Sequence, residues 1–168
     1  MSCLQLGFFL ASWGMLRGSS FLLSKSVKHY ENLITLISET KGKIWEIDVD
    51  NYTEENMELM LEFGSKIQKN LGSEKDNVTA TLTTKIMLGI FGNVIALDRY
   101  NRKAFGVRGF NRKTLKKLKS FYERNKAEID FVKIPTINFN NSNKAKRHYP
   151  KIKIIDMISW VEGQKKDN

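Results

Sequence analysis

The sequence predicts an all-α protein that folds as one compact domain of six or seven helices. Its 168 residues are the length of a single domain. Only two prolines occur, Pro135 and Pro150, so most of the chain lacks the strongest helix breaker. Apolar residues recur at helical spacing in several segments. The one segment with strand-like alternation, Ile44–Val49, is either a short strand or an extended connector, because no second strand pairs with it.

The first predicted helix spans Leu4–Leu23 and is apolar almost all round, with Arg17 as its only charge. We expect it to lie buried at the centre of the domain, with the other helices around it. Its unbroken apolar part, Leu6–Leu16, is shorter than the roughly 20 residues of a membrane-spanning helix. No basic residue precedes Arg17, as one would in a signal peptide. The sequence therefore favours a cytoplasmic protein without a membrane partner.

Six further helices are predicted from apolar spacing and from capping residues. Thr53 and Asn111 have the form of N-caps, and Gly92 is placed to stop a helix. The residues from Phe131 to Lys146 are rich in asparagine and are expected to be irregular. The domain is expected to end at residue 162, before a disordered tail of residues 163–168. The six helices are predicted over Lys25–Ser38, Glu54–Leu71, Thr79–Phe91, Asp98–Phe105, Arg112–Ile129 and Ile152–Val161.

The formal net charge of +10 is concentrated in one segment of the chain. Between Arg99 and Lys126 there are eleven lysines and arginines and one acid, Glu123, whereas the remaining residues balance. Lysines on an ordinary surface helix alternate with acids that pair with them four residues away, and this segment has almost none. These closely spaced positive charges repel one another unless an anion lies nearby, and phosphate is the commonest anion for a basic stripe. We therefore expect nucleic acid, DNA or RNA, as the partner.

The predicted contacts are mainly to the phosphate backbone, since neither a zinc finger nor a basic zipper is present to read bases. A second basic cluster near Lys151 extends the expected surface. Two alternatives stay open, an acidic protein partner of the inhibitor or antitoxin type and a role in solubility alone. The predicted nucleic-acid-binding residues are Arg99, Arg102, Lys103, Arg108, Arg112, Lys113, Lys116, Lys117, Lys119, Lys146, Arg147 and Lys151.

Asp98 is the candidate catalytic residue. Its setting, Gly-Ile-Phe-Gly-Asn-Val-Ile-Ala-Leu-Asp-Arg-Tyr, resembles the helix-hairpin-helix DNA glycosylases over Lys85–Phe105. In that family an aspartate that opens a helix stabilises a cationic sugar as the base leaves, so the resemblance implies a DNA-modifying enzyme that uses Asp98. The segment before it, Leu82–Lys85, lacks the family's glycine-rich hairpin. The alternative is that Asp98 only caps a helix.

Arg17 is expected either to pair with a buried acid such as Asp98 or Asp156, or to bind a phosphate. A concave pocket that holds Asp98, Arg17 and a lysine would favour an enzyme. A capping aspartate in a filled core would favour a binding protein. Whether the chain is an enzyme is thus left open by the sequence.

Cofactors and metals are not expected, because one cysteine and two scattered histidines offer no ligand spacing. The single cysteine also forms no internal disulfide, which suits a reducing compartment. Three sequence segments are similar to those of a group of uncharacterised bacterial helical proteins: ASWGMLRGSSFLL, KIMLGIFGNVIALDRY and YPKIKIIDMISW. That resemblance implies a bacterial or phage context and no particular chemistry. A defence-associated role is expected with the other interpretation, a nucleic-acid-modifying enzyme that uses Asp98.

Overall fold

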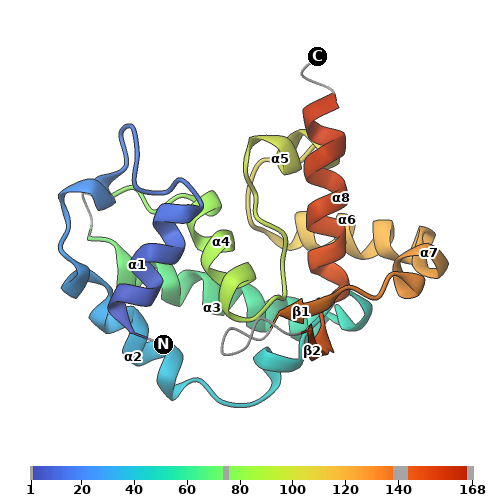
Figure 1. Ribbon diagram of the computed structural model, residues 1–168, viewed down its shortest axis with the longest axis horizontal. Coiled ribbons are helices and arrows are strands. Elements are labelled where there is room, and N and C mark those ends of the chain that lie inside the picture. The colour runs from blue at the N-terminus through green and yellow to red at the C-terminus, as the bar shows by residue number, and fades with distance from the viewer. Residues whose placement is uncertain (1, 74–75, 138–143, 166–168) are drawn as a thin grey trace.

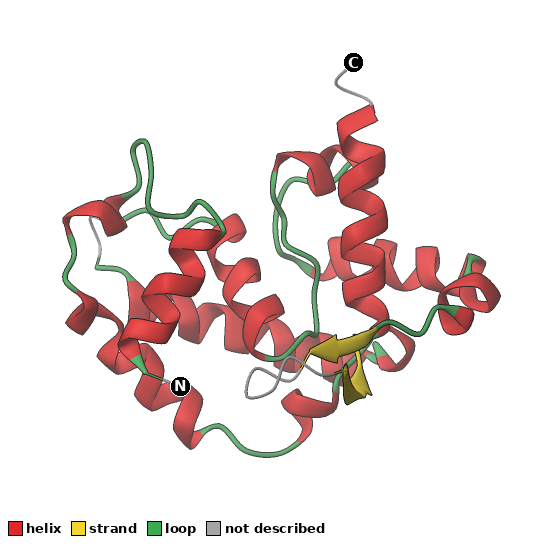
Figure 2. Ribbon diagram, viewed as in Figure 1, coloured by secondary structure: helices red, strands yellow, loops and turns green. Residues whose placement is uncertain are grey.

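Two groups of α-helices, α1–α4 and α5–α8, lie side by side in a computed structural model and are joined by a buried extended segment (Figure 1). The structure describes residues 2–73, 76–137 and 144–165. Helices dominate these residues, which form one compact domain and confirm the all-α prediction (Figure 2). The eight α-helices found in them are α1 (Cys3–Ser12), α2 (Glu31–Glu39), α3 (Glu54–Leu71), α4 (Ala80–Ile90), α5 (Arg99–Phe105), α6 (Arg112–Arg124), α7 (Lys126–Phe131) and α8 (Lys151–Lys165).

The N-terminal helix is shorter and more exposed than the sequence suggests. It ends at Ser12, and Gly14 follows with a φ of 67°, a left-handed conformation that ends the helix. Leu6 and Leu10 are buried, but Phe8 on the opposite side is 75% exposed. The expected central position of this helix is therefore wrong. It lies on the surface, and no helix of the described residues is long and apolar enough to cross a bilayer.

Helix α4 takes the central position instead. Each residue from Leu82 to Leu88 is buried, including Thr84 and Lys85. A helix that is covered all round must satisfy its polar side chains internally. The hydroxyl of Thr84 donates to the carbonyl of Ala80 at 2.8 Å, a bond that stays within the helix. Helix α4 thus brings several polar groups into the middle of the fold.

The segment that links the two groups of helices is extended and fully buried over Val94–Leu97. Extended backbone outside a sheet needs other hydrogen-bond partners. The N–H of Leu97 donates to the hydroxyl of Thr84 at 2.9 Å, and the N–H of Ala96 donates to the carboxylate of Asp156 at 2.9 Å. Side chains from α4 and α8 therefore hold this segment, which leads directly into the residue that opens α5.

Three helix starts were predicted correctly from their capping side chains. The side chains of Thr53, Asp98 and Asn111 accept hydrogen bonds from N–H groups three residues later, at 3.1, 2.9 and 3.0 Å. Each such bond satisfies one of the unpaired N–H groups of a first turn. These starts need only neighbouring residues, which explains why the sequence was sufficient.

Other boundaries differ from the prediction. The expected helix Arg112–Ile129 is broken at Asn125, whose φ of −117° is not helical, so α6 and α7 are separate. The region expected to be irregular contains an antiparallel pair, β1 (Pro135–Ile137) and β2 (Lys144–His148). The Ile44–Val49 region forms two short 3₁₀ turns, η3 (Lys43–Glu46) and η4 (Val49–Asn51). Two further 3₁₀ turns precede α2, at η1 (Phe21–Ser24) and η2 (Val27–Tyr30).

The last helix, α8, continues through residues expected to belong to the disordered tail. It runs to Lys165, and residues 166–168 lie outside the described part. Gly163 is buried, and a Cβ atom there would collide with the backbone carbonyl of Tyr100 in α5. Glycine therefore lets α8 approach the α5 backbone, and that contact extends the helix beyond its predicted end.

Candidate functional site

The basic helix α6 is partly neutralised by acids of α3. Arg112 forms ion pairs with Glu54 and Glu58, and the ammonium of Lys116 lies 2.8 Å from a Glu54 oxygen. Hydrogen bonds from Lys116 and Arg112 lower the pKa of the Glu54 carboxyl. The sequence suggested an uncompensated stripe because these acids are far away in the chain. The tertiary structure brings these acids next to α6, so fewer of its basic residues are unpaired than the sequence suggested.

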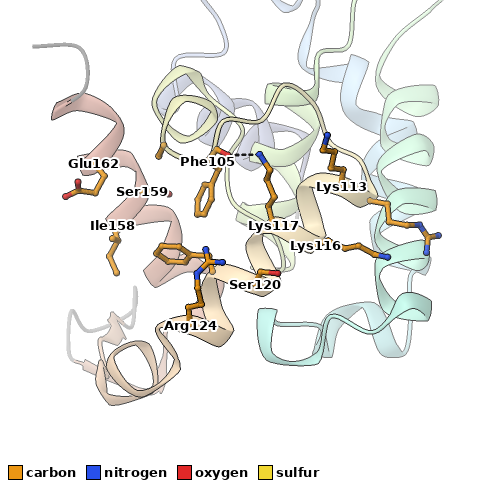
Figure 3. Close-up of a pocket in the computed structure, with 12 residues that line it drawn as sticks. Phe105, Lys113, Lys116, Lys117, Ser120, Arg124, Ile158, Ser159 and Glu162 are labelled. Atoms are coloured by element: carbon orange, nitrogen blue, oxygen red, sulfur yellow. Dashed lines mark hydrogen bonds between the residues drawn. The ribbon is translucent and has the colours of Figure 1, made fainter.

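The remaining cations line a groove between α5, α6 and α8 with a volume of about 930 Å³ (Figure 3). Lys113 and Arg124 are exposed, and their side chains form no ion pair with a described residue. Lys117 donates to the carbonyls of Phe105 and Gly106 at 3.2 and 3.1 Å, so its ammonium is held in place without losing its charge. We call this cavity the groove; its lining residues are Ala104, Phe105, Arg112, Lys113, Lys116, Lys117, Ser120, Phe121, Arg124, Ile158, Ser159 and Glu162.

Two phenylalanines form an apolar part of the groove wall. The rings of Phe105 and Phe121 meet edge to face, with their centroids 5.2 Å apart and their planes at 85°. Both side chains are half-buried and line the groove, so ring surface is available to a ligand. Ser120 adds an exposed hydroxyl between Lys117 and Arg124 (Figure 3). The groove thus combines cations and a hydroxyl with aromatic surface.

The structure separates the twelve predicted nucleic-acid-binding residues into several places. Four of them line the groove: Arg112, Lys113, Lys116 and Lys117. Lys119 lies 3.9 Å from Glu123, and Lys151 pairs with Asp50 and Asp130 at the start of α8. The others lie elsewhere: Arg99 and Arg102 on α5 toward a second cavity, Lys103, Arg108 and Arg147 exposed outside the groove, and Lys146 with a side chain outside the described part of the chain.

The sequence prediction omitted Arg124, Ser120 and the two phenylalanines of the groove. A signal was nevertheless present, because positions 113, 117, 120, 121 and 124 share one helical face. A face that carries lysine, serine, phenylalanine and arginine together is unusual for packing alone. Phe105 could not be added in this way, because it comes from a different helix.

A second cavity, the cleft, lies between the loop after α1, α4, α5 and α8 and has a volume of about 910 Å³. It contains Asp98, Arg17 and Lys85, the combination expected of an enzyme. Asp98 is also a helix cap, since one of its carboxylate oxygens accepts from the N–H of Asn101 at 2.9 Å. Its other oxygen accepts no hydrogen bond from the described residues. The capping role of Asp98 is therefore confirmed, and its catalytic role stays a prediction.

Lys85 is the buried cation of the cleft. Its side chain donates to the carbonyl of Trp13 at 2.7 Å and forms no ion pair with a described carboxylate, and the residue is 9% exposed. Burial lowers the pKa of this ammonium, and the charge of Arg17 lowers it further against the opposing effect of Asp98. Arg17 is exposed, and its side chain makes neither an ion pair nor a hydrogen bond within the described residues. The predicted pairing of Arg17 with Asp98 or Asp156 is wrong.

Asp156 is the carboxylate that joins the walls of the cleft. It is 5% exposed, and its Oδ1 accepts from the N–H of Ala96 and from the amide of Asn101, both at 2.9 Å. Its Oδ2 receives the ammonium of Lys153 at 2.9 Å. These three donors satisfy the hydrogen-bonding needs of the buried carboxylate. Asp156 thereby fixes the segment that leads to Asp98 and holds Lys153 at the cleft.

No protein-family model, curated protein or solved structure matches this chain. The function is therefore inferred from the residues of the groove and the cleft. Within the described residues, no group of three or more His, Cys, Asp or Glu side chains is placed to hold a metal ion. The two cavities present carboxylates, ammonium and guanidinium groups, hydroxyls and aromatic rings.

The packed pair of α5 and α8 separates the groove from the cleft. Ile158, Ser159 and Glu162 of α8 face the groove, whereas Met157 and Trp160 face the cleft. The two helices are in close contact along their length, down to backbone contact at Gly163. A single ligand therefore does not extend from one cavity into the other across α5 and α8.

Proposed function

We propose that this chain binds nucleic acid through the groove, mainly by contacts to phosphates. One observation carries the proposal. Lys113, Lys117 and Arg124 present charges without carboxylate partners beside a pair of half-buried aromatic rings. Cations that follow the backbone and aromatic rings that stack on bases are the two features of proteins that bind single strands. Their combination supports a single strand over a duplex, because the bases of a duplex are already stacked on one another.

Plain solubility explains these residues less well. Arg112 and Lys116 have acidic partners on α3, so the fold neutralises some of the basic residues of α6. Lys113 and Arg124 were left unpaired although Glu162 also lines the groove and pairs instead with Lys165 at 2.7 Å. The groove therefore keeps a positive potential that a phosphate chain would neutralise.

The salt dependence of binding tests this proposal. We expect the affinity for a labelled single-stranded oligonucleotide to fall with salt, with a log–log slope of about −2, because roughly three phosphates are neutralised at about 0.7 each. Fluorescence anisotropy across a salt series measures the slope, with the matching duplex as comparison. A slope near zero would contradict the proposal. So would equally strong competition by poly-glutamate, which would indicate an acidic protein as the partner.

A second candidate function is a DNA-modifying, glycosylase-like reaction that uses Asp98. The observation in its favour is the cleft, where an unshared oxygen of Asp98 lies in the same cavity as Lys85 and Arg17. A carboxylate in this position can stabilise positive charge that develops on a sugar as a base departs. Such a reaction requires the nucleic-acid substrate to reach the cleft. Binding in the groove does not by itself bring the substrate there.

The variant Asp98→Asn separates catalysis from capping. Asparagine caps helices as well as aspartate, so the variant should keep its fold while it loses the negative charge. If Asp98 is catalytic, base release from DNA that carries damaged or mismatched bases should fall on the order of 100-fold. Strand cleavage after alkali measures base release, and a thermal melt checks the fold. A folded variant with unchanged activity would show that Asp98 is a cap alone.

A further inference from the structure

The cleft has more positive than negative charge. Its lining includes the cations Arg17, Lys85, Arg99 and Lys153 and the carboxylates Asp98 and Asp156. Asp156 is already used by Lys153 and by two N–H donors, whereas Lys85 donates to a carbonyl and has no carboxylate partner among the described residues. A buried ammonium without a carboxylate is costly, and a bound anion would relieve that cost. The cleft is therefore suited to a negatively charged ligand.

Arg17 is positioned for such an anion by the loop after α1. Gly14 has a φ of 67°, and a Cβ atom there would come within 3.0 Å of the guanidinium carbon of Arg17. The absence of a side chain at Gly14 thus lets the guanidinium lie over the backbone at the edge of the cleft. The planar fork of donors on arginine matches the oxygens of phosphate.

The other walls of the cleft are aromatic. The ammonium groups of Lys85 and Lys153 lie 5.6 and 4.8 Å from the ring centre of Trp13. Tyr100 and Trp160 form an edge-to-face pair with centroids 5.5 Å apart, and Trp160 is 41% exposed. Exposed aromatic surface of this kind stacks on planar rings. The ligand that fits both features is a planar aromatic ring that carries an anionic group.

We propose that the cleft binds a free nucleoside 5′-phosphate, with its phosphate at Arg17 and Lys85 and its base against Trp160. The open carboxylate oxygen of Asp98 can then accept a hydrogen bond from a ribose hydroxyl or a base amino group. A free nucleotide is favoured over a strand because α5 and α8 separate the cleft from the groove. The inference requires neither nucleic-acid binding by the groove nor a reaction at Asp98.

Tryptophan fluorescence of the full chain tests this site. Two of the three tryptophans, Trp13 and Trp160, line the cleft, and Trp45 packs on Phe91 elsewhere. We expect at least one of AMP, GMP, CMP and UMP to quench the emission saturably, with a Kd on the order of 100 µM. Trp160→Phe should remove much of the quenching, whereas Trp45→Phe should keep it. Adenosine, ribose 5-phosphate and inorganic phosphate should each bind far more weakly than the best nucleotide.

A pair of variants tests the phosphate contact. Arg17→Gln should weaken nucleotide binding roughly tenfold, because a charge-assisted contact is lost. Lys69→Gln removes the same charge from the exposed surface of α3 and should leave binding unchanged. Three results would overturn the inference: no saturable quenching at millimolar nucleotide, phosphate alone binding as tightly as nucleotide, or displacement of the nucleotide by a single-stranded oligonucleotide at lower concentration. The last result would assign the cleft to a nucleic-acid strand.

Discussion

Reversing two of the three groove charges that lack an acidic partner, in the variant Lys113→Glu/Arg124→Glu, should reduce nucleic-acid affinity on the order of 1,000-fold at low salt. Both side chains are exposed and have no carboxylate partner among the described residues, so their loss frees no buried acid. The two new carboxylates would repel the phosphates that the cations attracted. Fluorescence anisotropy with a labelled single strand measures the change. The log–log salt slope should also change from about −2 to about −0.7, because each of the two lost phosphate contacts reduces its magnitude by about 0.7.

The matched control for this variant is Lys66→Glu/Lys69→Glu on α3. It makes the same change in net charge, and Lys69, like Arg124, belongs to the last turn of its helix. Affinity should change only slightly, since neither residue lines the groove. Equal losses in the two double variants would mean that net charge alone causes binding, which would refute the groove as the site.

The aromatic part of the groove can be tested separately with Phe121→Leu. Loss of one stacked base costs about 1–3 kcal/mol, so binding should weaken about tenfold. The salt slope should stay at the value of the unaltered protein, because no phosphate contact is removed. A changed slope with unchanged affinity would argue against stacking on Phe121.

Removal of the Asp156 carboxylate should have the largest effect on stability. Asp156→Ala leaves the N–H of Ala96 and one N–H of the Asn101 amide without their acceptor and leaves Lys153 without its acid. Loss of one partner from a buried pair costs about 3–5 kcal/mol in the free energy of unfolding. For a chain of this length the midpoint of thermal unfolding should fall by about 10 °C. Urea denaturation followed by circular dichroism gives the free energy directly.

Glu162→Ala provides the control on the same helix. Glu162 is exposed and pairs only with Lys165, three residues later, so its removal should change stability by less than about 0.5 kcal/mol. If Asp156→Ala were equally mild, the connecting segment would be held by apolar burial alone. The Asp156 network would then not be what positions Asp98.

Local features of the fold were predictable because they depend on neighbouring residues. The range of α3 and the caps at Thr53, Asp98 and Asn111 follow from side chains within one turn of the helix start. The N-terminal helix was misjudged because apolar composition does not indicate how many sides of a helix other elements cover. The extended run Val94–Leu97 was also missed, since its hydrogen-bond partners come from other helices.

In the candidate sites, too, local features were predictable from the sequence and contacts between distant residues were not. The basic segment and Asp98 were visible in the sequence, but the sequence could not show which charges are neutralised. Arg112 pairs with Glu54 across 58 positions of the chain, and Asp156 meets Asn101 across 55. The two phenylalanines of the groove come from different helices, and the cleft draws on four separate parts of the chain.

The sequence by itself determined that this protein is helical, where several helices begin, and that its net charge is carried by one segment. These properties come from local propensity and composition. The tertiary structure alone decided that Lys113, Lys117 and Arg124 have no acidic partner among the described residues, and that Asp98 lies in a cavity with Lys85 and Arg17. The physical reason is that pairing and enclosure depend on distances in space between residues far apart in the chain.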